Sequence, residues 1–146
     1  KGGLEAIVGN NAILQAAQKL AVEDRWSAPD PDNIRIDDVI AAAKNGARCL
    51  QEVYARAGRV LGISISNLIE LFNPSKVIIS GKGVQAGDLL FDAMYSAIQQ
   101  FASQKINGQA EVIVKDWNQK AYARGAGALV LQEIYQSPAN RVVPII

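Results

Sequence analysis

The chain has 146 residues, an apolar share of 49% and a net charge of +1, so it can form one hydrophobic core but offers no broad basic field for nucleic acid. It contains no histidine and one cysteine, which excludes a Ser-His-Asp triad, imidazole metal ligands, an internal disulfide and a cysteine-rich zinc site. We expect a single domain over residues 1–146 in a reducing cytoplasm, with no membrane segment, because neither a long apolar run nor a signal sequence is present.

The first half of the chain predicts helices. Apolar spacing indicates a helix over residues 10–25, capped by Asn10 or Asn11. The following stretch WSAPDPDNIR predicts a surface loop, because two prolines within three residues cannot continue a helix. A short helix capped by Asp37 or Asp38 comes next.

The longest periodic segment predicts a helix over residues 47–72. Gly58, Gly62 and Ser64 lie on or beside its apolar stripe, and such small residues favour close packing of the backbone against a sheet or another helix. Cys49 falls in the same pattern, so we expect it to be a buried structural thiol rather than a nucleophile.

A short apolar run at residues 77–80 predicts a strand that is buried on both faces. Gly81 and Gly83 follow it on either side of Lys82, and a helix begins at Asp88, which we expect to cap it. A ligand could meet free backbone N–H groups there. The pattern matches neither the Walker A loop nor the full dinucleotide fingerprint, and glycine at such a turn can serve geometry alone.

Residues 111–115 predict a second strand, and a last helix with many small residues begins at Asn118. The class is therefore α/β with helix predominating. Two strands are too few for a free-standing sheet, and the chain begins with Lys1 rather than methionine. We expect it to be part of a longer protein or to pair with a second copy.

Three segments, GGLEA, LGISISNLIELFNPSKVIISGKGVQAGDLLF and RGAGALVLQEIYQSP, resemble in order and spacing the C-terminal half of the ROK family. This family groups repressors, open reading frames and sugar kinases within the actin-like ATPase superfamily. The resemblance implies a helix-rich α/β fold, the C-terminal lobe of the actin-like ATPase (ribonuclease H-like) fold. It also implies that an N-terminal lobe and a DNA-binding domain lie upstream of this chain.

The resemblance implies roles for several residues. Glu5 matches a family glutamate that contacts sugar hydroxyls, although a solvated glutamate in a first helical turn is the alternative. Gly3 stands where the family has its third zinc cysteine, so we expect that no zinc site can be completed here. Gly81 and Gly83 match the adenosine-side GGG segment of the kinases, whereas Lys82 departs from it and could cover a nucleotide pocket or point to solvent.

The family's phosphate-binding loop and catalytic aspartate belong to its N-terminal half, so we expect no kinase activity and no cofactor in this chain alone. The first interpretation is the sugar-sensing, dimer-forming part of a transcriptional repressor of carbohydrate metabolism, which reaches DNA only through an upstream domain. Lys82, Gly3 and the EIYQSP ending favour it. The alternatives are the C-terminal lobe of an ATP-dependent sugar kinase, and a helical packing module that binds no ligand when isolated and associates as a homodimer through exposed apolar surface.

Overall fold

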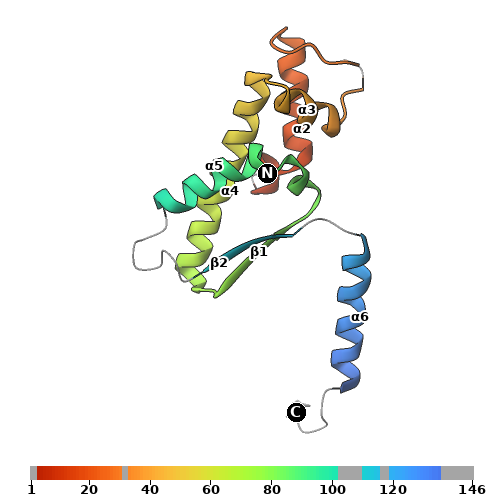
Figure 1. Cartoon of the computed structure of the whole chain (residues 1–146), viewed down its shortest axis with the longest axis vertical. Coiled ribbons are helices and arrows are strands. Elements are labelled where there is room, and N and C mark those ends of the chain that lie inside the picture. Colours follow the sequence, from red (N-terminus) through yellow and green to blue (C-terminus); the bar gives the residue numbers. More distant parts are fainter. Residues whose placement is uncertain (1–2, 31–32, 102–109, 116–118, 136–146) are drawn as a thin grey trace. The chain divides into compact units, whose positions relative to one another are not determined.

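The computed structural model describes residues 3–30, 33–101, 110–115 and 119–135 (Figure 1). Two compact units, residues 1–116 and 117–146, make up the chain. The elements of the first unit are α1 (Glu5–Val8), α2 (Asn10–Val22), α3 (Ile36–Lys44), α4 (Arg48–Phe72), β1 (Lys76–Ser80), the 3-10 helix η1 (Lys82–Ala86), α5 (Asp88–Phe101) and β2 (Glu111–Lys115).

The second unit contains α6 (Gln119–Tyr135). Its helical state confirms the prediction for this segment, whose expected first residue, Asn118, lies outside the described residues. Leu129, Val130 and Leu131 are exposed on α6.

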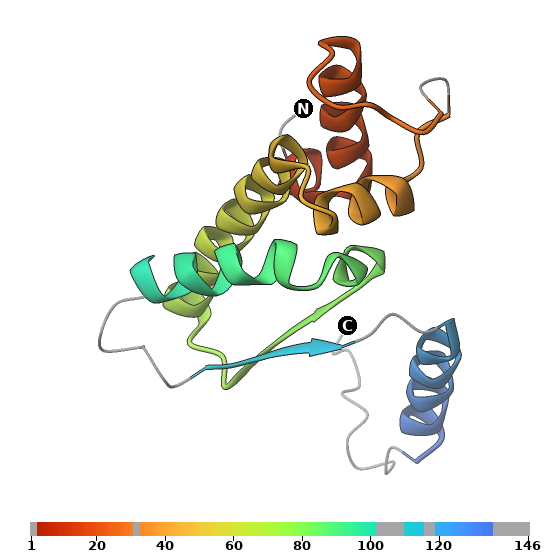
Figure 2. The same cartoon turned by 45° about the horizontal axis from the view of Figure 1, so that its top comes forward.

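Helices α4 and α5 cross in direct contact at the centre of the first unit (Figure 1; Figure 2). A Cβ atom added at Gly58 would collide with the carbonyl oxygen of Leu90. A Cβ atom at Gly62 would collide with the carbonyl oxygen of Met94 and lie 2.7 Å from the Cβ of Ala97. The two glycines therefore let the backbones touch, which confirms the prediction of close packing against another helix.

Two apolar clusters lie along α4. Around its first half, α2, α3, η1 and the start of α5 contribute buried residues, among them Ile13, Val39, Ala86 and Leu90. The loop after α2 is tied to this cluster at both ends, because the side chains of Trp26 and Ile34 are each only 9% exposed. Around the second half of α4, the buried residues are Ile65, Ile69, Met94 and Ile98.

The sheet consists of β1 and β2, which pair in parallel from Lys76 opposite Glu111 to Ser80 opposite Lys115. Both strands were predicted. Val77, Ile79 and Val112 pack against the second cluster on α4 and α5. Ile78 points to the other face and is 64% exposed. The prediction that residues 77–80 form a strand buried on both faces is therefore wrong, because among the described residues α4 and α5 cover only one face of the sheet.

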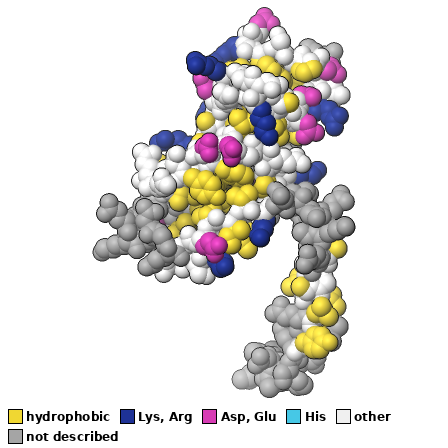
Figure 3. Space-filling model, viewed as in Figure 1, with side chains coloured by type: hydrophobic (Ala, Val, Ile, Leu, Met, Phe, Trp, Pro, Cys, Tyr) yellow, Lys and Arg dark blue, Asp and Glu magenta, His cyan; other side chains and the backbone are white. Residues whose placement is uncertain are grey.

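Apolar side chains also gather on the surface of this unit, in the middle of the face that Figure 3 shows. Leu68, Leu71 and Phe72 near the end of α4 are 45%, 76% and 68% exposed. Within the described ranges, no helix combines the length and apolar character needed to cross a bilayer.

The starts of the helices differ from the predictions. Neither asparagine at the start of α2 caps it, because the N-cap position belongs to Gly9. Arg35 holds that position in α3, and the carboxylate of Asp38 accepts a hydrogen bond from the backbone N–H of Arg35 at 3.1 Å. Several polar residues in a row leave the position of a cap open, and helix ends are defined only to within one or two residues.

Replacing Gly62 by alanine tests the α4–α5 contact. The added Cβ would push against the Met94 backbone, so we expect Gly62→Ala to lower the free energy of unfolding by about 1–3 kcal/mol despite the higher helix propensity of alanine. Asn67→Ala, at an exposed position of the same helix, is the matched control and should be neutral or stabilising. Urea unfolding followed by circular dichroism measures both, and equal effects would contradict the contact.

Among the described residues, Tyr54 on α4 is the largest fully buried side chain, and it is 1% exposed. Its hydroxyl has no hydrogen-bond partner among the described residues. Burial, and secondarily the negative charge of Asp37, raise the pKa of Tyr54 from 10.0 to about 12. The native state therefore favours the neutral phenol, and this preference stabilises the fold fully below pH 10 and is lost as the pH rises from 10 to about 12.

Tyr54→Phe should remove this pH dependence. At pH 7 we expect the variant to be as stable as the native protein or more stable, by up to about 1 kcal/mol, because an unpaired buried hydroxyl is gone. Between pH 10 and 12 the native protein should lose stability more steeply than the variant, since each unit of pKa difference corresponds to about 1.4 kcal/mol. Urea titrations at several pH values measure the two slopes, and parallel slopes would show that the phenol is not desolvated.

Candidate functional site

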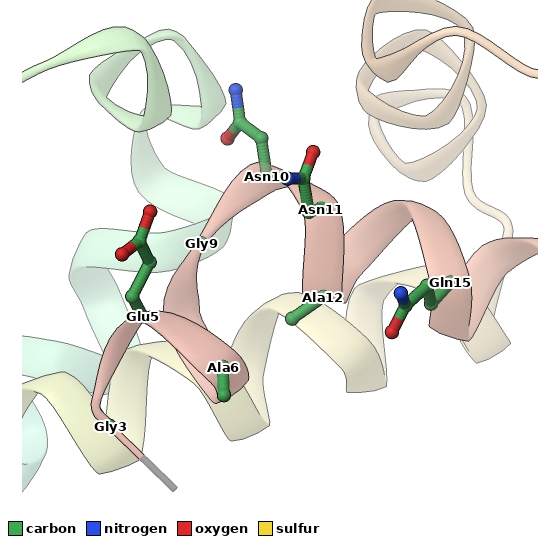
Figure 4. Close-up of a pocket in the computed structure, with 8 residues that line it drawn as sticks. All are labelled: Gly3, Glu5, Ala6, Gly9, Asn10, Asn11, Ala12 and Gln15. Atoms are coloured by element: carbon green, nitrogen blue, oxygen red, sulfur yellow. The ribbon is translucent and has the colours of Figure 1, made fainter. Parts of the chain in front are cut away.

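A pocket of about 630 Å³ lies at the turn between α1 and α2 and contains Glu5 (Figure 4). Its polar wall is formed by Glu5, Asn10, Asn11 and Gln15. Glu5 is exposed in the first turn of α1, and its carboxylate has no ion-pair or hydrogen-bond partner in the described part of the chain. The side chains of Glu5 and Asn10 project to the same side of the turn (Figure 4).

This wall suits a ligand that both donates and accepts hydrogen bonds. A carboxylate only accepts, and a carboxamide does both. A molecule with several neighbouring hydroxyl groups can therefore donate to Glu5 and also bond to the amides of Asn10 and Asn11. The wall holds no cation to bind an anionic group, because no lysine or arginine lines the pocket among the described residues.

Gly9 joins α1 to α2 and determines where Glu5 lies. Its backbone N–H donates to the carbonyl oxygen of Glu5 at 2.9 Å, and its own carbonyl accepts from Ala12 and Ile13. A Cβ atom at Gly9 would lie 2.6 Å from the Glu5 carbonyl oxygen and 3.1 Å from Glu5 Cγ. Gly9 thus lets the pocket wall fold tightly, although the sequence analysis did not identify it.

The glycine segment after β1 is more complex than predicted. Gly81 has a positive φ of 127°, a backbone conformation that favours glycine. Gly87 also has a positive φ, of 61°, whereas Gly83 does not. Gly81 precedes η1 and Gly83 lies within it, so neither glycine of the predicted pair lies at the start of α5. Asp88 is the first residue of α5, and the carbonyl of Gly87 accepts the first hydrogen bonds of that helix. Lys82 is exposed.

The structure brings the Glu5 pocket and the glycine segment together through Asn10. Asn10 lines the pocket, and its Oδ1 lies 3.7 Å from the position that a Cβ of Gly83 would occupy. Gly81, Lys82 and Gly83 do not line the pocket. From the sequence, the sugar position at Glu5 and the nucleotide-side glycines were expected to form separate sites.

Two further sequence predictions concern metal and thiol chemistry. Gly3 has no donor side chain, and no group of three or more His, Cys, Asp or Glu side chains within the described residues could hold a metal ion. The expectation that no zinc site can be completed here stays a prediction. Cys49 is partly buried against the first cluster, and its thiol donates to the carbonyl oxygen of Arg25 at 3.3 Å. These contacts agree with a structural thiol.

Comparison with known proteins identifies the family. The sequence model of the ROK family matches residues 1–133, so the chain belongs to this family. It is 33% identical over 144 residues to the xylose repressor of Caldicellulosiruptor bescii, covering 94% of this chain and 35% of the repressor. It is also 33% identical over 129 residues to the transcriptional dual regulator NagC of Escherichia coli, covering 88% of this chain and 32% of NagC. The chain thus spans about a third of these relatives.

Solved structures show the same fold. A ROK family transcriptional regulator, a homologue of the E. coli MLC protein, has a TM-score of 0.74 at 27% identity, over 92% of this chain and 34% of that one. A ROK family glucokinase from Streptomyces griseus has a TM-score of 0.73 at 21% identity, over 88% of this chain and 44% of the kinase. The helix-rich α/β prediction is therefore confirmed as a ROK-like fold that covers part of those chains.

Gly9→Ala tests how Glu5 is held. Because a Cβ at Gly9 would overlap the Glu5 backbone, we expect the α1–α2 turn to open and the free energy of unfolding to fall by about 1–3 kcal/mol. Gly3→Ala is the matched control on the same pocket wall, since a Cβ there has nothing within 4 Å. Unfolding curves and the amide chemical shifts of residues 5–13 report the change. Identical effects of the two substitutions would contradict this role of Gly9.

Proposed function

We propose that this chain is the sugar-sensing and dimer-forming part of a ROK-type transcriptional regulator of carbohydrate metabolism. The carrying observation is the unpaired carboxylate of Glu5 on a pocket wall of side-chain amides. Such a wall satisfies the hydroxyl groups of a sugar, and a carboxylate forms stronger hydrogen bonds than a neutral acceptor. The sugar is the effector, and its binding changes how the regulator engages DNA through another domain in the cytoplasm.

The relatives support a regulator rather than an enzyme. The xylose repressor and NagC are regulators by name, and each is 33% identical to this chain. The glucokinase, at 21% identity, supports the fold alone. Lys82 also interrupts the run of glycines that the family's kinases place against nucleotide. The kinase alternative predicts that the full-length protein transfers phosphate from ATP to a hexose.

Dimer formation is proposed from exposed apolar surface. Leu71 and Phe72 near the end of α4 are 76% and 68% exposed, and Leu68 lies one turn earlier. Large exposed apolar side chains close together are typical of association surfaces. A second copy of the chain is the proposed partner, as in most soluble oligomers.

Sugar titration of the full-length protein tests the effector site. With D-xylose, N-acetylglucosamine and D-glucose as probes, we expect calorimetric binding of at least one, weakened about tenfold or more by Glu5→Ala, because a charge-assisted hydrogen bond contributes about 1.5–3 kcal/mol. Glu5→Gln keeps the shape of the side chain but not its charge, so the sugar affinity of this variant should lie between those of the native protein and Glu5→Ala.

Gln18→Ala is the matched control. Gln18 is exposed on α2 and does not line the pocket, so this substitution should leave the sugar affinity unchanged. Equal heats for native and Glu5→Ala protein would remove Glu5 from the site. Phosphorylation of a hexose by the full-length protein with ATP would contradict the regulator.

A further inference from the structure

The segment from Gly81 to Gly87 is held firmly at its ends. At its start it continues from β1, and at its end Ala86 is 1% exposed in the first apolar cluster. Between these points, the N–H of Val84 bonds to the carbonyl of Gly81 at 3.1 Å, and the N–H of Gly87 bonds to the carbonyl of Val84 at 3.0 Å. Gly87 then accepts the first hydrogen bonds of α5. A shift of η1 therefore reaches the start of α5.

The side chain of Asn10 connects this segment to the pocket. Asn10 is half-buried, and its carboxamide has no hydrogen-bond partner in the described part of the chain. One side of it faces the pocket that contains Glu5, while Oδ1 lies 3.7 Å from the Cβ position of Gly83. The carboxamide lies beside the backbone of η1 at Gly83, and no hydrogen bond to the described residues keeps it from turning toward a ligand.

We infer that Asn10 couples occupancy of the Glu5 pocket to the 81–87 segment and hence to α5. A ligand hydroxyl that bonds to the Asn10 carboxamide fixes its orientation, and this orientation determines its contact with Gly83. Helix α5 packs backbone to backbone on α4 at Gly58 and Gly62, so a displacement at its start is carried into the central helix pair. For the identity of the ligand, this inference rests on the proposed function. The contact between Asn10 and Gly83 is independent of that function.

Hydrogen exchange of the ligand-free, full-length protein tests the contact. We expect Asn10→Ala to speed exchange of the amides of Val84 and Gly87 by about threefold or more, because the segment loses a side chain that lies beside Gly83. Gln15→Ala, on the same pocket wall but away from Gly83, is the control and should leave both amides unchanged. Unchanged exchange in Asn10→Ala would overturn the inference.

A double-mutant cycle tests the coupling to the ligand. Gly83→Leu places bulk against Asn10, so we expect it to weaken binding of whichever of D-xylose, N-acetylglucosamine or D-glucose the native protein binds by about fivefold. In the Asn10→Ala background the same change should have less than about a twofold effect. Gln85→Leu, exposed in the same η1 turn, is the control for added bulk.

The outcomes separate this inference from the proposed function. Additive effects of Asn10→Ala and Gly83→Leu on sugar affinity would overturn the coupling even if sugar binds. If none of the three sugars binds the native protein, the proposed function fails. The exchange rates of Val84 and Gly87 then decide by themselves whether Asn10 supports the segment.

Discussion

The arrangement of the first unit depends on the backbone contact between α4 and α5. Gly58 and Gly62 leave no side chain between the helices, so the carbonyl groups of Leu90 and Met94 lie directly against α4. Dispersion attraction falls steeply with distance, and closely packed backbones gain contacts that larger residues would prevent. The contact fixes α5, and α5 in turn fixes the β1 and β2 strands through Ile98 and Met94.

The candidate site depends on the same contact. Its two parts are far apart in the sequence of the first unit: the pocket belongs to the α1–α2 turn, which packs on α4, and the 81–87 segment leads into α5. Asn10 lies beside Gly83 because α2, α4 and η1 contribute to the same buried cluster. In the proposed coupling, ligand binding at Glu5 affects the position of the 81–87 segment through packed side chains and not through a direct bond.

The elements with strong periodicity were predictable. The helix over residues 47–72 appears as α4 within one residue, and both strands lie where the apolar runs placed them, because long amphipathic stripes and bounded β-branched runs carry most of the local signal. The caps, η1 and the uncovered face at Ile78 were not predictable. They depend on which neighbour packs against each segment, and a single glycine or asparagine does not encode its neighbour.

The sequence by itself determined the class of fold and the family resemblance, and from that resemblance came the hypothesis that Glu5 binds a ligand. Local patterns and spaced motifs are sufficient for these conclusions. The tertiary structure decided which glycines matter and why: Gly9 makes room for Glu5 and Gly62 for the Met94 backbone, whereas a Cβ at Gly83 would only touch the side chain of Asn10. A glycine in a sequence records only a missing side chain, and the atoms that occupy the vacated space are known only once distant segments have been packed together.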